Sequence, residues 1–135
     1  MKPGARAKKK LSTQDRRVLA RWAADCAEHV LLYFEKEYPT DDRPRKAIEA
    51  ARAWARGRTT VGEARKASVA AHAAARRAKD VAARAAARAA GQAVATAHMA
   101  GHAPHAANYA AAAAGAAGIA KEREWQNQRL PKRLQ

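Results

Sequence analysis

The sequence predicts an all-α protein, a compact alanine-rich bundle of about five helices with an uncharged central helix pair. Alanine, the strongest helix former, provides 41 of the 135 residues. Val, Ile, Leu and Phe together provide only 15, which is too few for a sheet-based fold, because strands are rich in β-branched and aromatic residues. Residues 89–120 contain no Asp, Glu, Lys or Arg. Helices without a charged face are expected to be covered by the rest of the chain, by a second copy or by a partner.

Caps and helix breakers give the expected boundaries. The first helix begins after Ser12, which stands three residues before Asp15 in an arrangement resembling a capping box, and Pro39 ends it. It contains most of the large apolar residues, repeated at steps of three and four. The other helices are expected over residues 42–57, 60–78, 80–101 and 104–128. Their expected N-caps are Asp42, Thr60 (in a full capping box with Glu63) and Asp80.

The expected organisation is a single helical domain over residues 12–130, with a basic tail at 1–11 and a short C-terminal tail at 131–135 after Pro131. A single cysteine, Cys26, excludes an intramolecular disulfide. The basic start is not followed by an apolar segment of the kind found in secretory signals. No strongly apolar run reaches membrane length. We therefore expect a soluble, cytoplasmic protein that makes no membrane contact.

Positive charge is distributed unevenly. The formal net charge is +15, yet residues 11–42 carry seven acidic and four basic groups, whereas residues 43–88 carry thirteen basic and three acidic groups. One face is therefore expected to be strongly basic, with a patch formed by Arg43, Arg45, Lys46, Arg52, Arg56, Arg65, Arg76 and Arg77. Such a patch suits non-specific phosphate binding. It is equally the solvated helix surface of a chain whose composition is biased towards Ala and Arg, and the sequence leaves both interpretations open.

The histidines suggest a pocket. His98 and His102 are four residues apart, which places them on one face of a helix, and Pro104 interrupts the helix before His105. A metal or a small ligand is one possible occupant, and a buried hydrogen-bond network that fixes helix register is the other. We assign no metal and no cofactor. The residues expected to line such a pocket are His72, His98, His102, His105 and Tyr109.

Catalytic combinations are weak in this sequence. Cys26 and His29 are three residues apart on an apolar stripe, which favours a structural cysteine. Asp25 and Glu28 share a helix face, but paired-carboxylate chemistry needs a cleft, which no sequence feature indicates. We therefore expect no catalytic residues and no enzyme. The tryptophans are expected to anchor the core and to attach the last helix: Trp22, Trp54 and Trp125.

Five segments, in order, resemble a bacterial family labelled putative immunity proteins. They are ADCAEHVLLYFE at 24–35, DDRPRKAIEAARAWARG at 41–57, EARKASVAAHAAAR at 63–76, ARAAGQAVATAHMAGHAPHAANYA at 87–110 and KEREWQNQRLP at 121–131. The resemblance implies a small all-helical protein that neutralises a toxin by binding it and covering its active surface. The high positive charge favours an acidic toxin over a basic one.

The shortage of large apolar side chains also bears on self-association. Because the core is thin in large side chains, stability must come from many small contacts or from a dimer interface, so we expect a homo-oligomer. The alternatives to an immunity-type role are a basic helical module that binds nucleic acid non-specifically, and a protein with a histidine-lined metal or ligand site.

Overall fold

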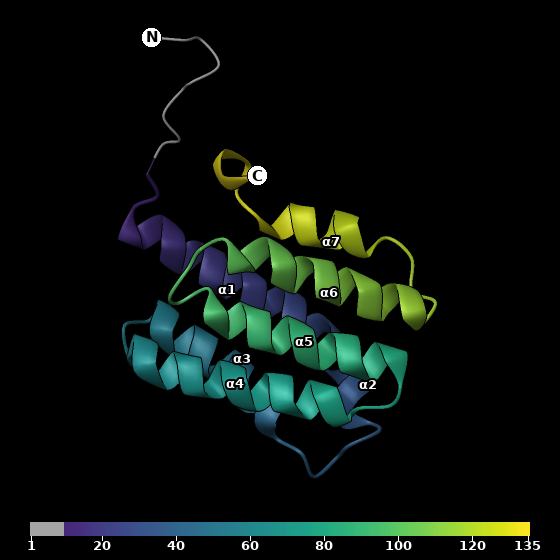
Figure 1. Ribbon diagram of the computed structural model, residues 1–135. Coiled ribbons are helices and arrows are strands. Elements are labelled where there is room, and N and C mark those ends of the chain that lie inside the picture. The colour runs from purple at the N-terminus through teal and green to yellow at the C-terminus, as the bar shows by residue number, and fades with distance from the viewer. Residues whose placement is uncertain (1–9) are drawn as a thin grey trace, which may run out of the picture.

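The computed structural model describes residues 10–135 and is helical throughout, without a strand in that range. Its elements are α1 (Thr13–Val30), α2 (Leu32–Glu35), α3 (Arg43–Ala55), α4 (Val61–Arg77), α5 (Val81–Ala95), α6 (His102–Ala116), α7 (Glu122–Arg129) and the 3-10 turn η2 (Lys132–Leu134). Figure 1 shows their order along the chain. The predicted all-α class is confirmed, but the number of helices is seven where about five were expected.

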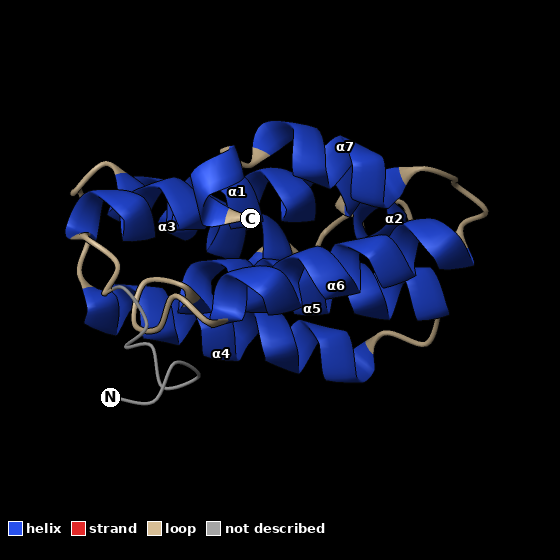
Figure 2. Cartoon of the chain, turned by 90° about the horizontal axis from the view of Figure 1, so that it is seen from above, coloured by secondary structure: helices blue, strands red, loops and turns tan. Residues whose placement is uncertain are grey.

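The helices form two layers. In Figures 1 and 2, α4, α5 and α6 lie side by side in one layer, and α1, α2 and α3 lie in the other. The short helix α7 packs on α6 and lies beside α1. Helix α5 contacts α1, α3, α4 and α6, so it has neighbours both within its layer and across the interface between layers.

Burial differs between the two helices that carry no acidic residue. Ten of the fifteen residues of α5 are buried, nearly all of them alanines. In α6 the alanines facing the core are buried, while an outer side that includes His105, Asn108, Tyr109 and Ala112 is exposed. The large apolar side chains of the core come mainly from α1 and α3, among them Trp22, Val30, Ile48 and Trp54.

The expected first helix is broken before Pro39. It ends at Val30, and the backbone N–H of Leu31 bonds to the carbonyl of Glu28 three residues back, which is a tighter turn than the α-helix has. The chain then restarts as α2. Leu31 at this junction and Phe34 in α2 are both buried.

Three of the four predicted N-caps are confirmed. The side chains of Ser12, Thr60 and Asp80 each accept a hydrogen bond from the backbone N–H three residues on, at 3.0, 3.1 and 2.9 Å. Asp42 occupies the predicted N-cap position of α3, but its side chain makes no capping hydrogen bond and pairs with Lys46, while the Asp41 carboxylate accepts from the Arg43 N–H. The capping box at Thr60 is half formed, since the Glu63 carboxylate bonds to Lys66.

Two glycines with positive φ end helices. Gly57, at φ +74°, follows α3 and is the last residue of the segment 42–57 in which a helix was expected. Gly118, at φ +79°, follows α6, and the next residue, Ile119, donates its N–H to the carbonyl of Ala114. This is the Schellman arrangement, which needs the left-handed backbone that glycine adopts without strain. It divides the expected helix 104–128 into α6 and α7.

The connection between α5 and α6 also differs from expectation. Helix α5 ends at Ala95 and not near residue 101, and residues 96–101 form turns. Helix α6 then begins at His102, so Pro104 lies in its first turn, where no backbone N–H is needed for the helix ladder. The sequence predicted that Pro104 interrupts the helix between His102 and His105. That prediction is wrong, because both histidines lie on α6.

The two ends of the chain differ in how far the structure describes them. Most of the predicted basic tail, residues 1–9, lies outside the described part. At the other end a 3-10 turn follows Pro131, and the Gln135 side chain donates to the carbonyls of Asn127 and Leu130. Within residues 10–135, no helix combines the length and apolar character needed to cross a membrane.

Candidate functional site

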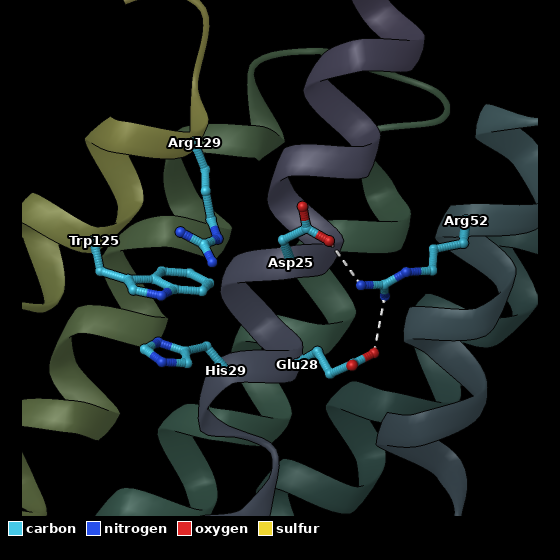
Figure 3. Close-up of a pocket in the computed structure, with 6 residues that line it drawn as sticks. All are labelled: Asp25, Glu28, His29, Arg52, Trp125 and Arg129. Carbon is cyan, nitrogen blue, oxygen red and sulfur yellow. Dashed lines mark hydrogen bonds and ion pairs between the residues drawn. The ribbon is translucent and has the colours of Figure 1, made fainter.

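An open cleft of about 490 Å³ lies between α1, α3 and α7 (Figure 3). Its lining consists mainly of polar and ionisable side chains, so it differs from a pocket of the apolar core. Helix α1 contributes three of them in one turn, α3 contributes one and α7 contributes two. The lining residues are Asp25, Glu28, His29, Arg52, Trp125 and Arg129.

Arg52 joins α3 to α1 across this cleft. Its Nη2 donates to Asp25 Oδ1 at 2.7 Å, and its Nη1 lies 3.1 Å from Glu28 Oε1. The guanidinium is partly buried, with a quarter of its side chain exposed, while both carboxylates retain more exposure. Because Arg52 is shared by two carboxylates, this wall carries a net negative charge.

Trp125 forms the other wall, within a stack of three side chains. Its ring lies parallel to the His29 imidazole, with ring centroids 3.6 Å apart and an interplanar angle of 7°. On the opposite side the Arg129 guanidinium lies 4.0 Å from the indole centroid, a cation–π contact. Figure 3 shows the indole between these two groups. Arg129 has no carboxylate within ion-pair distance in the described part of the chain.

Buried polar contacts hold α7 against α1 and α6. Glu122 is buried, and its carboxylate lies 2.9 Å from His29 Nδ1. The Trp22 indole N–H donates to the backbone carbonyl of Gln126 at 2.8 Å, and the Gln126 side chain donates to the carbonyl of Ala107 at 2.8 Å. The position of Trp125 is therefore fixed by hydrogen bonds on both sides of the short helix.

The neighbouring cysteine is not a reactive group. Cys26 is fully buried. Burial raises the pKa of its thiol to about 12, with the nearby carboxylates of Glu122 and Asp25 acting in the same direction. A thiol with that pKa stays protonated at neutral pH and is a poor nucleophile.

Part of this cleft was visible in the sequence. The pairing of Asp25 and Glu28 on one helix face is correct, and the cleft that the sequence did not show is present beside them. Trp125 was expected to attach the last helix, and it does pack there, but it also remains half exposed at the cleft. Arg52 contacts Asp25 and Glu28, which are 27 and 24 residues away, and His29 contacts Glu122 and Trp125, which are 93 and 96 residues away. These contacts have no local sequence signal.

The predicted histidine pocket is a row along the α5–α6 connection. The ring centroids of His98 and His102 are 5.0 Å apart, and those of His102 and His105 are 6.2 Å apart. His102 Nδ1 bonds to Gln92 Oε1 at 2.7 Å, whereas the buried Nδ1 of His98 has no hydrogen-bond partner in the described residues. Over residues 10–135, no three His, Cys, Asp or Glu side chains are grouped to hold a metal ion.

The other two predicted pocket residues are placed differently. His72 in α4 packs against Gly91 of α5, and its Nδ1 lies 2.8 Å from Nη1 of Arg88. Burial, Arg88 and Arg76 lower its pKa, and His102 adds a smaller effect in the same direction. Burial, His98 and His105 likewise lower the pKa of His102. Tyr109 lies one turn beyond His105 on α6, in an exposed groove between α5 and α6 that Arg88 also lines.

The predicted basic patch separates into two groups. The four basic residues on the first three turns of α3 each form ion pairs with nearby carboxylates. The pairs are Arg43 with Asp41, Arg45 with Glu35, Lys46 with Asp42, and Arg52 with Asp25 and Glu28. The other four are exposed and make no ion pair among residues 10–135: Arg56, Arg65, Arg76 and Arg77. Free positive charge is thus concentrated on the α4 side.

The protein is therefore a small all-helical protein with an open, polar cleft on its surface. The sequence model of the Imm-5 like putative immunity protein family matches residues 9–133. The chain belongs to this family, as the resemblance of its five segments implied. No curated protein and no solved structure gives a match.

Proposed function

We propose that this chain is an immunity-type protein that acts by binding a partner protein and covering the partner's active surface, and that it catalyses no reaction. The observation that carries the proposal is the Trp125 stack at the open cleft. Tryptophan and arginine are the residue types that most often dominate protein–protein binding energy. Here both are held in a fixed arrangement before any partner arrives, which lowers the entropy lost on binding.

The remaining groups of the cleft support binding over catalysis. Asp25 and Glu28 both contact Arg52, so their charges are partly neutralised within the chain. His29 is stacked on Trp125 and paired with Glu122. Such mutual contacts hold the surface in one arrangement before a partner binds, which favours binding.

The test uses proteins encoded beside this gene as candidate partners, each co-expressed with the full chain. We expect one of them to co-purify and to remain bound after nuclease treatment and at high salt. Trp125→Ala and Arg129→Ala should each weaken the complex about tenfold or more, which is the size of a hot-spot effect.

Arg21→Ala is the matched control, because Arg21 is an exposed arginine of α1 outside the cleft. It should leave the affinity within about twofold. The proposal is wrong if no candidate binds, or if the cleft variants bind as tightly as the Arg21 variant while remaining folded.

Non-specific nucleic-acid binding is the second candidate function. The exposed arginines of α4, which lack carboxylate partners, support it, since phosphate contacts need little beyond such charges. Binding of duplex DNA should then fall steeply as salt rises, and an Arg76→Ala, Arg77→Ala double variant should reduce the slope by about two. A partner that resists nuclease and salt favours the first function.

Self-association and a cytoplasmic location remain predictions. Sedimentation equilibrium at several protein concentrations tests the first directly, since a homodimer gives twice the 14.5 kDa mass of one chain. Fractionation of cells that express the native gene tests the second.

A further inference from the structure

The outer face of the α4–α5–α6 layer has almost no negative charge. Between residues 61 and 120 the only acidic residues are Glu63, which pairs with Lys66, and Asp80, which caps α5. The same segment contains seven cations: Arg65, Lys66, Arg76, Arg77, Lys79, Arg84 and Arg88. All but Arg88, which is half-buried, are exposed. The acidic residues of the chain lie almost entirely on the other elements.

A groove of about 330 Å³ runs between α5 and α6 on this face. Its lining joins apolar side chains to two guanidinium groups: Val81, Arg84, Ala85, Arg88, Tyr109 and Ala112. Val81 is 72% exposed and Tyr109 38%. Exposed apolar groups bordered by fixed charges are typical of a binding surface.

The two arginines of the groove are positioned by neutral acceptors. Arg84 donates through Nε and Nη2 to the carbonyl of Ala78, at 3.0 and 2.7 Å. Arg88 contacts the His72 imidazole. The cations at the start of α3 have carboxylate partners, whereas the positive charges in this groove are fixed in position without being neutralised.

We propose that this groove docks an acidic segment of a partner protein that also carries an apolar side chain. The apolar side chain would fill the space between Tyr109, Val81 and Ala112, and carboxylates would pair with Arg84 and Arg88, in the bidentate geometry that guanidinium favours. This proposal rests on the proposed function, in that the chain works by binding protein. It adds the chemistry of the partner and a second surface on the opposite layer from the cleft.

Charge argues against the other occupants of the groove. A second copy joined through this face by two-fold symmetry would bring the unneutralised arginines of both copies together. The chain's own first nine residues contain four cations and no acid, so they do not complement the face. A nucleic acid would satisfy the arginines but would leave Val81 and Ala112 without an apolar partner.

The test selects phage-displayed random peptides against the full chain and measures the affinity of the enriched peptides by fluorescence anisotropy. We expect peptides that combine Asp or Glu with a large apolar residue. Tyr109→Ala removes one wall of the groove, and Ala112→Gln fills it. Each should weaken binding about tenfold while leaving the net charge unchanged.

Ala116→Gln is the matched control, because Ala116 is an exposed alanine one turn further along α6 and outside the groove lining. It should keep the affinity within about twofold, and thermal melting should show that all three variants fold. The proposal is overturned if the enriched peptides lack acidic residues, or if Tyr109→Ala and Ala112→Gln bind them like the control. It is also overturned if duplex DNA displaces the peptides from the chain and binds all three variants with the same affinity.

Failure of the groove and failure of the proposed function are distinguishable. A partner whose capture depends on Trp125 but not on Tyr109 refutes the groove and leaves the function intact. Acidic peptides that bind the groove, in a chain for which no neighbouring gene product binds, support the groove and refute the cleft-mediated immunity role.

Discussion

Gly91 marks the point where α4 and α5 pack without space for a side chain. A Cβ at this position would lie 2.6 Å from His72 Nε2, with two more ring atoms within 2.9 Å. The Ser68 hydroxyl donates to the Gly91 carbonyl at 2.9 Å, so the close approach is reinforced by a hydrogen bond. The His72 ring has limited freedom to move, because Arg88 holds its other side.

Gly91→Ala should therefore lower the free energy of unfolding by about 1–3 kcal/mol, as overpacked sites do. Gly115→Ala is the control, since a Cβ there would meet no atom within 4 Å apart from the adjacent residues and the backbone of its own helix. It should raise stability by up to about 1 kcal/mol, because alanine is the better helix former. Urea unfolding measures both. Adding His72→Ala to Gly91→Ala should restore part of the lost free energy of unfolding, because it removes the ring that the new Cβ meets. Equal changes in stability at positions 91 and 115 would contradict the close packing of His72 on Gly91.

The histidines give a pH dependence whose sign can be stated. The pKa values of His72 and His102 are lowered from 6.5 by burial and by the positive groups around them, namely Arg88, Arg76, His98 and His105. As the pH falls through about 6.5 the unfolded chain therefore takes up protons that the folded chain does not. Stability from these groups is fully present above that pH and is lost below it.

We expect the free energy of unfolding to decrease between about pH 7.5 and pH 5, and a His72→Gln, His102→Gln double variant to show a smaller decrease. Hydrogen bonds from Arg133, Arg45 and Arg43 lower the pKa values of Asp15, Glu35 and Asp41 from their ordinary values of 3.8, 4.5 and 3.8, so the stability from these carboxylates is lost only at lower pH. Denaturant unfolding at several pH values provides the measurement. A chain that becomes more stable on acidification over this range would contradict the assignment.

At the scale of elements, α7 is attached mainly by polar contacts. It has eight residues, and only Glu122 and Gln126 among them are buried. Gln126 receives the Trp22 indole N–H on its backbone carbonyl and donates its side-chain amide to Ala107. The cleft therefore depends on hydrogen bonds for the position of one of its walls.

Gln126→Leu should cost about 1 kcal/mol, because it removes the side-chain hydrogen bond from Gln126 to the Ala107 carbonyl of α6. Amide hydrogen exchange should show residues 122–129 losing protection before the other helices do. Gln128→Leu, at an exposed position of the same helix, should change stability by no more than about 0.5 kcal/mol. If Gln126→Leu leaves α7 as protected as in the parent chain, another contact holds it.

The elements also show what local sequence signals can and cannot predict. Ser12, Thr60, Asp80 and Gly57 act within one turn of the chain, and each was identified correctly. Gly118 ends α6 within one turn, as Gly57 ends α3, but from the sequence alone a glycine at this position is equally compatible with close packing inside a continuing helix. The break at Leu31 has no such signal, because it follows from burying Leu31 and Phe34 against distant parts of the core.

At the scale of the whole molecule, charge divides the surface. The layer of α4, α5 and α6 has free cations and an apolar groove, while the α1–α3–α7 side has carboxylates paired with arginines around the Trp125 cleft. The sequence indicated the uneven charge from residue counts alone. It did not separate neutralised from free cations, because Asp25 and Arg52 are brought together by the packing of α1 on α3.

The proposed immunity role can be measured by the growth of cells that produce a toxic product of a neighbouring gene. We expect the full chain to restore growth, the Arg21→Ala variant to restore it equally, and the folded Trp125→Ala variant to fail. Restoration by a chain that never forms a complex with the toxic protein, or equal protection by all three chains, would contradict an immunity role that depends on binding at the cleft.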